Sequence, residues 1–145
     1  MKSPEKLWRD VAYRFAQQSK CQSRQVGAII VTPDNHMIGQ GYNGAPVGSK
    51  CKDCPRCRNK VESGKGLDRA ICTHAEANAI AYAAKVGFST KNCTLYSTLK
   101  PCLECAKLII GAGISRVVYY NDYDDPEGLA IQCLKCANIK VKEIK

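Results

Sequence analysis

The chain has 145 residues, of which 45% are hydrophobic and 24% are charged, and its formal net charge is +9. A chain of this length buries a single core, so we expect one domain over residues 1–145. No segment approaches the roughly 20 apolar residues that span a bilayer, and the charged start lacks the apolar centre of a signal peptide. We therefore predict a cytoplasmic protein with no membrane partner.

The first predicted element is an amphipathic helix from residue 5 to about residue 20, where apolar residues recur at helical spacing. Two short apolar runs follow, at residues 26–31 and 37–42, and the turn residues Pro33-Asp34-Asn35 lie between them. This pattern predicts a β-hairpin that supplies the first two strands of a sheet. The apolar side of the helix is expected to cover that sheet.

Residues 43–72 are rich in Gly, Pro, Cys, Lys and Arg and show no apolar period. A loop of this length in a compact domain needs something to order it, and a metal ion is the candidate. We interpret the stretch at about 48–72 as a Cys-rich insertion. Between residues 48 and 70 it carries seven Lys or Arg against three acids, which could attract a phosphate-bearing ligand or form a solvated surface.

The rest of the chain alternates between helices and strands. Helices are predicted at residues 75–84, 102–111 and 129 to about 136, and strands at residues 93–98, 115–121 and 139–144. Together with the hairpin, these strands make a five-stranded mixed sheet. The predicted class is α/β, as a three-layer α/β/α domain with helices on both faces of the sheet.

The strongest motif is His74-Ala75-Glu76 followed by Pro101-Cys102-Leu103-Glu104-Cys105. His74, Cys102 and Cys105 supply three zinc ligands and leave the fourth tetrahedral position for water, as a catalytic zinc requires. Glu76 is not a ligand and can move the protons of that water. The spacing H-x-E with P-C-x-x-C is the signature of zinc nucleobase deaminases. The alternative is a satisfied core histidine with two buried thiols, which would need these residues to fall at helix starts by coincidence.

The motif makes specific demands on the two helices that carry it. Cys102 and Cys105 stand at positions i and i+3 on one helix face, so both sulfurs can converge on one ion. His74 and Glu76 can reach the same site only if their helix begins near residue 73 or 74. Pro101 is expected in the first turn of the second helix. The positive ends of both helices would then favour thiolate and hydroxide.

Several segments carry a resemblance to a known family. They are Ser19-Lys20-Cys21, the run from Gln25 to Val31, Gly41-Tyr42-Asn43-Gly44-Ala45-Pro46, the run from His74 to Ile80, and Thr98-Leu99-Lys100-Pro101-Cys102. Over nearly its whole length the chain resembles the deoxycytidylate deaminase family of the cytidine deaminase-like superfamily. The resemblance implies a cytidine deaminase-like fold and hydrolysis of dCMP to dUMP and ammonia in pyrimidine deoxynucleotide metabolism. It also implies that a zinc-activated water attacks C4 of cytosine while Glu76 passes protons to N3 and to the leaving amine.

The resemblance further implies roles for residues that bind the substrate. Asn43 would contact the sugar, although an Asn-Gly turn explains this residue equally well. Ala75 is a second substrate-binding candidate. Tyr123 would lie against the nucleotide, with a partly exposed turn tyrosine as the alternative. Arg24 is the candidate for the 5'-phosphate because of its bidentate fork, and Lys100 is the alternative cation.

The cysteine pattern predicts a second metal site. Ten cysteines, several spaced as C-x2-C in a chain without a secretion signal, indicate metal ligands rather than disulfides. Five of them could supply the four thiolates of a closed site: Cys21, Cys51, Cys54, Cys57 and Cys72. Relatives vary in this region, so the set of four stays open. We expect one catalytic and one structural Zn²⁺, with free thiols as the alternative to the second, and interpret Cys133 and Cys136 as core residues.

Two other functions share some of these features. A polynucleotide deaminase acting on tRNA or single-stranded DNA would use the same zinc site, but the chain shows no clear platform for base stacking. A non-catalytic zinc-binding module would leave Glu76 unexplained. The expected partner is therefore the nucleotide dCMP and not nucleic acid. The resemblance also implies a homo-oligomer, a hexamer, and allosteric control by dCTP and dTTP with Mg²⁺.

Overall fold

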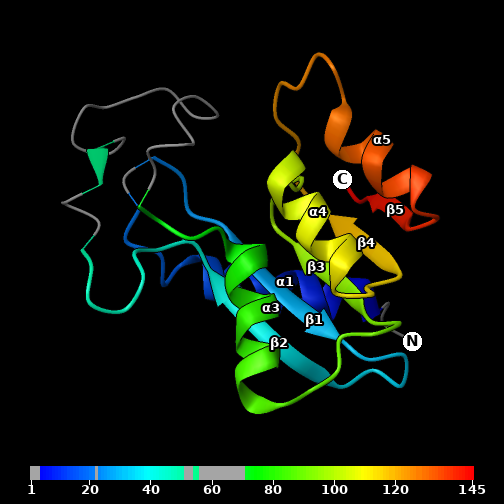
Figure 1. Ribbon diagram of the computed structural model, residues 1–145, viewed down its shortest axis with the longest axis horizontal. Coiled ribbons are helices and arrows are strands. Elements are labelled where there is room, and N and C mark those ends of the chain that lie inside the picture. Colours follow the sequence, from blue (N-terminus) through cyan, green and yellow to red (C-terminus); the bar gives the residue numbers. More distant parts are fainter. Residues whose placement is uncertain (1–3, 22, 51–53, 56–70) are drawn as a thin grey trace.

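The computed structural model describes residues 4–21, 23–50, 54–55 and 71–145. Its centre is a five-stranded sheet with the strand order β2-β1-β3-β4-β5 (Figure 1). The strands are β1 (Gly27–Val31), β2 (Met37–Tyr42), β3 (Thr94–Ser97), β4 (Arg116–Tyr119) and β5 (Lys140–Glu143). β1 runs antiparallel to β2 and β3, whereas β3, β4 and β5 run parallel to one another. The predicted mixed sheet, including its opening hairpin, is confirmed.

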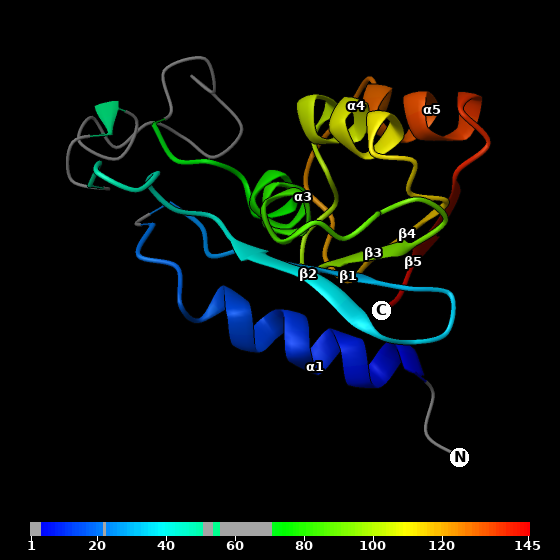
Figure 2. The same cartoon turned by 60° about the horizontal axis from the view of Figure 1, so that its bottom comes forward.

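Helices cover both faces of this sheet. They are α1 (Pro4–Ala16), α3 (Ala75–Val86), α4 (Leu103–Gly111) and α5 (Leu129–Cys136). Figure 2 shows α1 below the sheet and α3, α4 and α5 above it. The predicted three-layer α/β/α fold is therefore confirmed.

The central strand β1 is buried along its whole length. Its side chains alternate between the two faces of the sheet, as strand geometry requires. Ile29 and Val31 pack with Trp8 of α1, whereas Ala28 and Ile30 belong to the core beneath α3 and α4. Because both faces are covered, the strand has a continuous apolar sequence instead of an apolar-polar alternation.

Two glycines let helices lie directly on the hairpin. A Cβ atom on Gly27 would come within 2.1 Å of the Ala12 carbonyl oxygen in α1. A Cβ atom on Gly41 would lie 2.6 Å from the Ala79 nitrogen and 2.7 Å from the Ala75 carbonyl oxygen in α3. Glycine has no Cβ, so both helix backbones can approach the strands this closely. The contact at Gly41 holds the N-terminal half of α3 against the end of β2.

The first helix is shorter than the sequence pattern indicates, because it ends at Ala16 and not at about residue 20. Beyond it, the buried Ser19 donates its hydroxyl to the Asn43 carbonyl oxygen at 2.7 Å. Gln25 Nε2 in turn donates to the Ser19 carbonyl oxygen at 2.9 Å. These bonds draw the chain between α1 and β1 toward the end of β2, which explains why the helix cannot continue.

The predicted Cys-rich insertion at about 48–72, with its basic run, lies mostly outside the described residues and stays a prediction. Where the described chain resumes, Thr73 and Gly44 exchange two backbone hydrogen bonds of 2.8 and 3.1 Å. This bridge places the residues that precede α3 beside Asn43. Within the described ranges, no helix combines the length and apolar character needed to cross a bilayer.

Candidate active site

The N-termini of α3 and α4 carry the His and Cys residues of the motif. His74 is the N-cap of α3 and Cys102 is the N-cap of α4, and both have extended backbone conformations. Their carbonyl oxygens accept the first helical hydrogen bonds, from Asn78 and Ala106, each at 2.9 Å. Neither side chain forms a cap hydrogen bond to its own helix. Both side chains can therefore act as ligands.

The expected position of Pro101 was wrong. Pro101 was predicted in the first turn of its helix, but it precedes the N-cap Cys102 and lies outside the helix. Cys102 consequently projects from extended backbone, while Cys105 lies within the first turn of α4. The residue before a proline avoids helical conformation, so the Lys100-Pro101 step favours a helix that begins only after this point.

The three proposed metal ligands lie close together. His74 Nδ1 is 3.4 Å from Cys102 Sγ and 3.4 Å from Cys105 Sγ. Among the described residues, these three form the group of His, Cys or acidic side chains whose ligand atoms all lie within 4.8 Å of one another. In a tetrahedral zinc site, Zn–S bonds of about 2.3 Å and Zn–N bonds of about 2.0–2.1 Å separate N and S by about 3.5 Å. The spacing therefore fits zinc.

The two sulfurs differ in their environment. The close contact with Cys105 lowers the pKa of Cys102, with burial acting in the opposite direction and His74 adding to the decrease. The pKa of Cys105 is raised by its contact with Cys102, by burial and by the neighbouring Glu76 carboxyl group. The first-turn N–H groups of both helices add positive potential. Such surroundings favour one thiolate before any metal binds, and a metal ion would favour the second.

Glu76 lies beside the ligand group and is 4% exposed. Its Oε1 accepts a hydrogen bond from the Ser97 hydroxyl at 2.9 Å, and its Oε2 accepts one from Cys105 Sγ at 3.3 Å. Burial raises the pKa of Glu76, while its own backbone N–H, His74, Ser97 and Cys105 act in the opposite direction. A raised pKa brings a carboxyl group closer to the range in which a general acid or base works at neutral pH.

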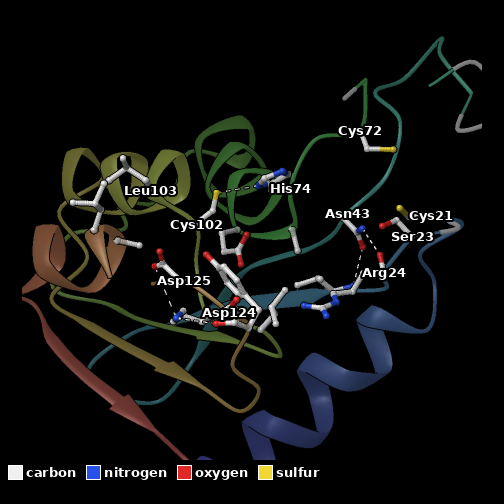
Figure 3. Close-up of a pocket in the computed structure, with 18 of the residues that line it drawn as sticks. Cys21, Ser23, Arg24, Asn43, Cys72, His74, Cys102, Leu103, Asp124 and Asp125 are labelled. Atoms are coloured by element: carbon white, nitrogen blue, oxygen red, sulfur yellow. Dashed lines mark hydrogen bonds and ion pairs between the residues drawn. The ribbon is translucent and has the colours of Figure 1, made fainter. Parts of the chain in front are cut away.

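A pocket of about 570 Å³ opens onto this group. His74, Glu76 and Cys102 line it together with all four predicted substrate-binding residues, which are Arg24, Asn43, Ala75 and Tyr123. Figure 3 shows His74 and Cys102 pointing toward each other, with Asn43 and Arg24 on the side of β2 and Asp124 and Asp125 on the side of α5. The volume is within the range of small-ligand sites, roughly 300–1,000 Å³.

The side-chain amide of Asn43 bonds to the chain that precedes β1. Asn43 Oδ1 accepts from the Val26 N–H at 2.8 Å, and Asn43 Nδ2 donates to the Arg24 carbonyl oxygen at 2.6 Å. Both ends of the amide thus join the end of β2 to the loop that carries Arg24. In this structure Asn43 has a clear role in shaping the pocket wall, in addition to its place on the pocket surface.

The two cations proposed for the phosphate occupy different surroundings. Arg24 is exposed at the pocket rim, where its guanidinium can meet a ligand. Lys100 is buried, and its ammonium lies 2.7 Å from Asp122 Oδ1 and 3.9 Å from Asp125 Oδ2. Because Lys100 is already paired with these carboxylates, Arg24 is the better phosphate candidate.

Tyr123 forms part of the same wall. Its hydroxyl donates to the Pro101 carbonyl oxygen at 3.3 Å, and the Lys100 ammonium lies 4.7 Å from the centre of its ring. Burial raises the pKa of Tyr123, and the neighbouring Cys102 and Asp125 add to this effect.

Two features of the site were missed from the sequence. They are Ser97, which contacts Glu76, and the acidic residues Asp124 and Asp125 that line the pocket after β4. The signal available in the sequence for Ser97 was its place at the end of a strand, directly before the turn that leads to Cys102.

The proposed second metal site is only partly described. Cys21, Cys54 and Cys72 line the same pocket as the motif residues, whereas Cys51 and Cys57 lie outside the described residues. Cys54 Sγ accepts a hydrogen bond from the Ile71 N–H at 3.4 Å. The predicted core position of Cys136 is wrong, because this residue is exposed.

The sequence also matches a known family. The zinc-binding region of cytidine and deoxycytidylate deaminases matches residues 2–121. The deoxycytidylate deaminase of Mycobacterium phage D29 is 41% identical over 115 residues, which cover 75% of this chain and 88% of the phage protein. That of the fission yeast Schizosaccharomyces pombe is 36% identical over 137 residues, covering 92% of this chain. The match extends over only 42% of the yeast protein's length.

A solved structure agrees with these matches. The dCMP deaminase of cyanophage S-TIM5, crystallised with dCMP and dUMP, superposes on this chain with a TM-score of 0.80 and 29% sequence identity. The superposition covers 99% of both chains. The metal group, the buried glutamate and the pocket described above therefore occur in the fold of these enzymes. The chain belongs to the deoxycytidylate deaminase family, within the cytidine deaminase-like zinc deaminases.

Proposed function

We propose that this protein hydrolyses dCMP to dUMP and ammonia, with zinc held by His74, Cys102 and Cys105. The observation that carries the proposal is the convergence of His74 Nδ1 and two sulfurs beside the buried carboxylate of Glu76, at the base of a pocket. The phage and yeast relatives are named deoxycytidylate deaminases, and the cyanophage enzyme was crystallised with dCMP and dUMP. These names support a nucleotide as the substrate.

The chemistry needs an activated water and a group that carries protons. Zinc, when bound, acts as a Lewis acid that makes a water nucleophilic at neutral pH. Glu76 takes a proton from the water that adds to C4 of cytosine and delivers it to N3. It then carries the proton of the new C4 hydroxyl to the amino group, which leaves as ammonia while the C4 carbonyl of uracil forms. The raised pKa of Glu76 suits both directions of transfer.

Residues around the pocket would position the nucleotide. Arg24 at the rim supplies a bidentate donor for the 5'-phosphate. Asn43 lines the pocket beside Arg24 and on the same side of it, which suits the predicted contact with the sugar. Ala75 and Tyr123 supply apolar and aromatic surface for the base. Substituting Arg24 by Gln is expected to weaken binding of dCMP and leave deoxycytidine almost unaffected.

We also propose a second, structural zinc, bound by four of Cys21, Cys51, Cys54, Cys57 and Cys72. Three of these cysteines lie on one pocket, which supports the proposal without selecting the four. Metal analysis of the purified protein should give two zinc ions per chain, and one zinc per chain would overturn this part. A homo-oligomer, with a hexamer implied by the family resemblance, and regulation by dCTP and dTTP with Mg²⁺ stay predictions of that resemblance. A cytoplasmic location stays a prediction of the sequence.

The deciding experiment offers zinc-loaded protein four substrates in parallel and follows the loss of ultraviolet absorbance as cytosine becomes uracil. The substrates are dCMP, dCTP, deoxycytidine and a cytosine-containing oligonucleotide. Turnover of dCMP with little turnover of the oligonucleotide supports the proposal. Turnover of the oligonucleotide alone would replace it with a polynucleotide deaminase, and no turnover of any substrate by zinc-loaded protein would overturn it.

A further inference from the structure

The hydroxyl of Ser97 contacts the proposed proton carrier. Ser97 is the last residue of β3 and is 0% exposed, between Ala28 of β1 and Tyr119 of β4. Its Oγ donates a hydrogen bond to Glu76 Oε1 at 2.9 Å. Both partners are buried, so bulk water cannot readily replace this bond if the hydroxyl is removed.

The hydrogen of this hydroxyl has a defined direction. The Leu99 N–H donates to Ser97 Oγ at 3.4 Å, which occupies an acceptor site of the oxygen. A hydroxyl has a single hydrogen to donate, and here that hydrogen goes to Glu76. The strand end and the turn after it therefore orient the hydroxyl toward the carboxylate.

The bond from Ser97 becomes more important when zinc is bound. Among the residues that the structure describes, the second side chain that donates to Glu76 is the Cys105 thiol, at 3.3 Å from Oε2. A cysteine that ligates zinc is deprotonated and can no longer donate a hydrogen bond. Of these two donors, both within the described residues, Ser97 alone then retains its hydrogen. The terminal torsion of a glutamate is soft, so loss of this contact would let the carboxylate rotate.

We propose that Ser97 is a positioning residue that holds the Glu76 carboxylate in the orientation needed for proton transfer to and from the substrate. The inference rests on the proposed role of Glu76. It assigns Ser97 no contact with the substrate or the metal. Because a correctly oriented base contributes in the transition state more than in substrate binding, loss of Ser97 should lower kcat and leave KM almost unchanged.

The neighbouring residue Thr98 offers a matched control. Thr98 is also buried, and its Oγ1 accepts a hydrogen bond from the Gly27 N–H at 3.1 Å. This bond joins β3 to the start of β1 and makes no contact with Glu76. Substituting Thr98 by Val removes a buried hydroxyl from the same end of β3. This variant should therefore lose protein stability as Ser97→Ala does, but keep the Glu76 carboxylate in position.

The test compares Ser97→Ala with Thr98→Val in zinc-loaded protein. We expect Ser97→Ala to reduce kcat for dCMP about 10- to 100-fold, the range for a lost hydrogen bond to a charged group, with KM changed less than about threefold. Zinc content should equal that of the wild type. A crystal structure of this variant should show the Glu76 carboxylate rotated or in two orientations. Thr98→Val should lower Tm while its kcat stays within about twofold of wild type.

A double-mutant cycle separates positioning from a structural effect. In a Glu76→Gln background the proton carrier is absent, so adding Ser97→Ala should lower the residual rate by less than about threefold. An equal fold-loss in both backgrounds would overturn the inference, as would an unchanged kcat in Ser97→Ala alone. If wild-type protein turns over dCMP while Ser97→Ala is unaffected, only this inference fails. If zinc-loaded wild-type protein does not turn over dCMP, the proposed function fails and the inference fails with it.

Discussion

The ammonium of Lys100 lies 2.7 Å from the Asp122 carboxylate and is almost completely enclosed, with the Lys100 side chain 8% exposed. It also donates to the Tyr123 carbonyl oxygen at 3.3 Å. The hydrogen bond from Lys100 is the main reason that the pKa of Asp122 is lowered, with burial acting in the opposite direction. A buried cation from the turn after β3 thus holds the segment after β4, which forms one wall of the pocket.

Substituting Lys100 by Met should loosen this wall. The aliphatic volume is retained, but Asp122 and Asp125 lose their shared cation. We expect the free energy of unfolding to fall by about 1–3 kcal/mol and KM for dCMP to rise several-fold, with a smaller change in kcat. Urea unfolding and steady-state kinetics measure both effects. Lys107→Met is the control, because Lys107 forms an exposed pair with Glu104; equal effects in the two variants would contradict the role of Lys100.

Replacing Glu76 by Gln removes the proposed proton carrier with little change in shape. The zinc ligands remain, so zinc content should be normal, whereas kcat should fall by about two to four orders of magnitude. Single-turnover kinetics with metal-analysed protein provide the measurement. Glu104→Gln, at an exposed position of the first turn of α4, should keep wild-type activity. Near-normal turnover by zinc-loaded Glu76→Gln would remove Glu76 from the mechanism.

A change of one metal ligand should remove one zinc ion. Cys102→Ser replaces a thiolate ligand by a weak one, so we expect loss of one zinc equivalent per chain together with loss of activity. The matched control is Cys136→Ser, at an exposed cysteine outside the metal group. Elemental analysis after gel filtration gives the result. Retention of the full zinc content by Cys102→Ser would exclude this residue as a ligand.

The close contact at Gly41 should be intolerant of any side chain. The Cβ of Gly41→Ala would lie 2.6–2.7 Å from backbone atoms of α3, so the helix must shift and carry His74 and Glu76 with it. We expect lower Tm, weaker zinc retention and reduced kcat. Gly111→Ala is the control, since a Cβ there meets no atom within 4 Å and alanine favours the helix, with an expected gain of up to about 1 kcal/mol. A Gly41→Ala protein with wild-type zinc retention would show that α3 can adjust.

Stability should depend on the charge of Glu5. Burial raises the pKa of Glu5, but hydrogen bonds and charges from Lys142 and Arg116 outweigh it and hold this pKa below the ordinary value of 4.5. A lowered folded-state pKa stabilises the fold above pH 4.5, and this stabilisation is lost as the pH falls through the folded pKa. Glu5→Gln should therefore lower the free energy of unfolding by about 1 kcal/mol at pH 7 and by much less near pH 3. A pH-independent difference from wild type would exclude this ion pair as its cause.

Local sequence patterns predicted most of the secondary structure. Each predicted strand and helix after residue 25 is present, with ends that differ by a few residues. The ends of the helices depend on contacts with distant residues, which the local pattern of apolar residues does not show. α1 stops at Ala16 because Ser19 bonds to the Asn43 carbonyl oxygen, and Pro101 lies before its helix instead of inside it.

The side-chain partners in the pocket could not be derived from sequence. Lys100 was a plausible phosphate ligand until its carboxylate partners were known, and they come from a segment more than twenty residues later in the chain. Asn43 is predicted to contact the sugar, and the sequence did not show that both ends of its amide also bond to the chain before β1. Ser97 had no visible role because Glu76, its partner, lies on a different element.

The sequence by itself determined which residues are the candidates for zinc binding and proton transfer, because this chemistry requires particular residue types at short and recognisable spacings. It also determined the layered fold, because the period of apolar residues distinguishes helices from strands. Only the tertiary structure decided that Ser97 donates a hydrogen bond to Glu76 and that Asp122 and Asp125 pair with Lys100. It also decided that Arg24 lies exposed at the pocket rim, where it can bind a ligand. Those choices depend on distances between strands and helices that are far apart in the sequence, and packing of the sheet against α3 and α4 establishes them.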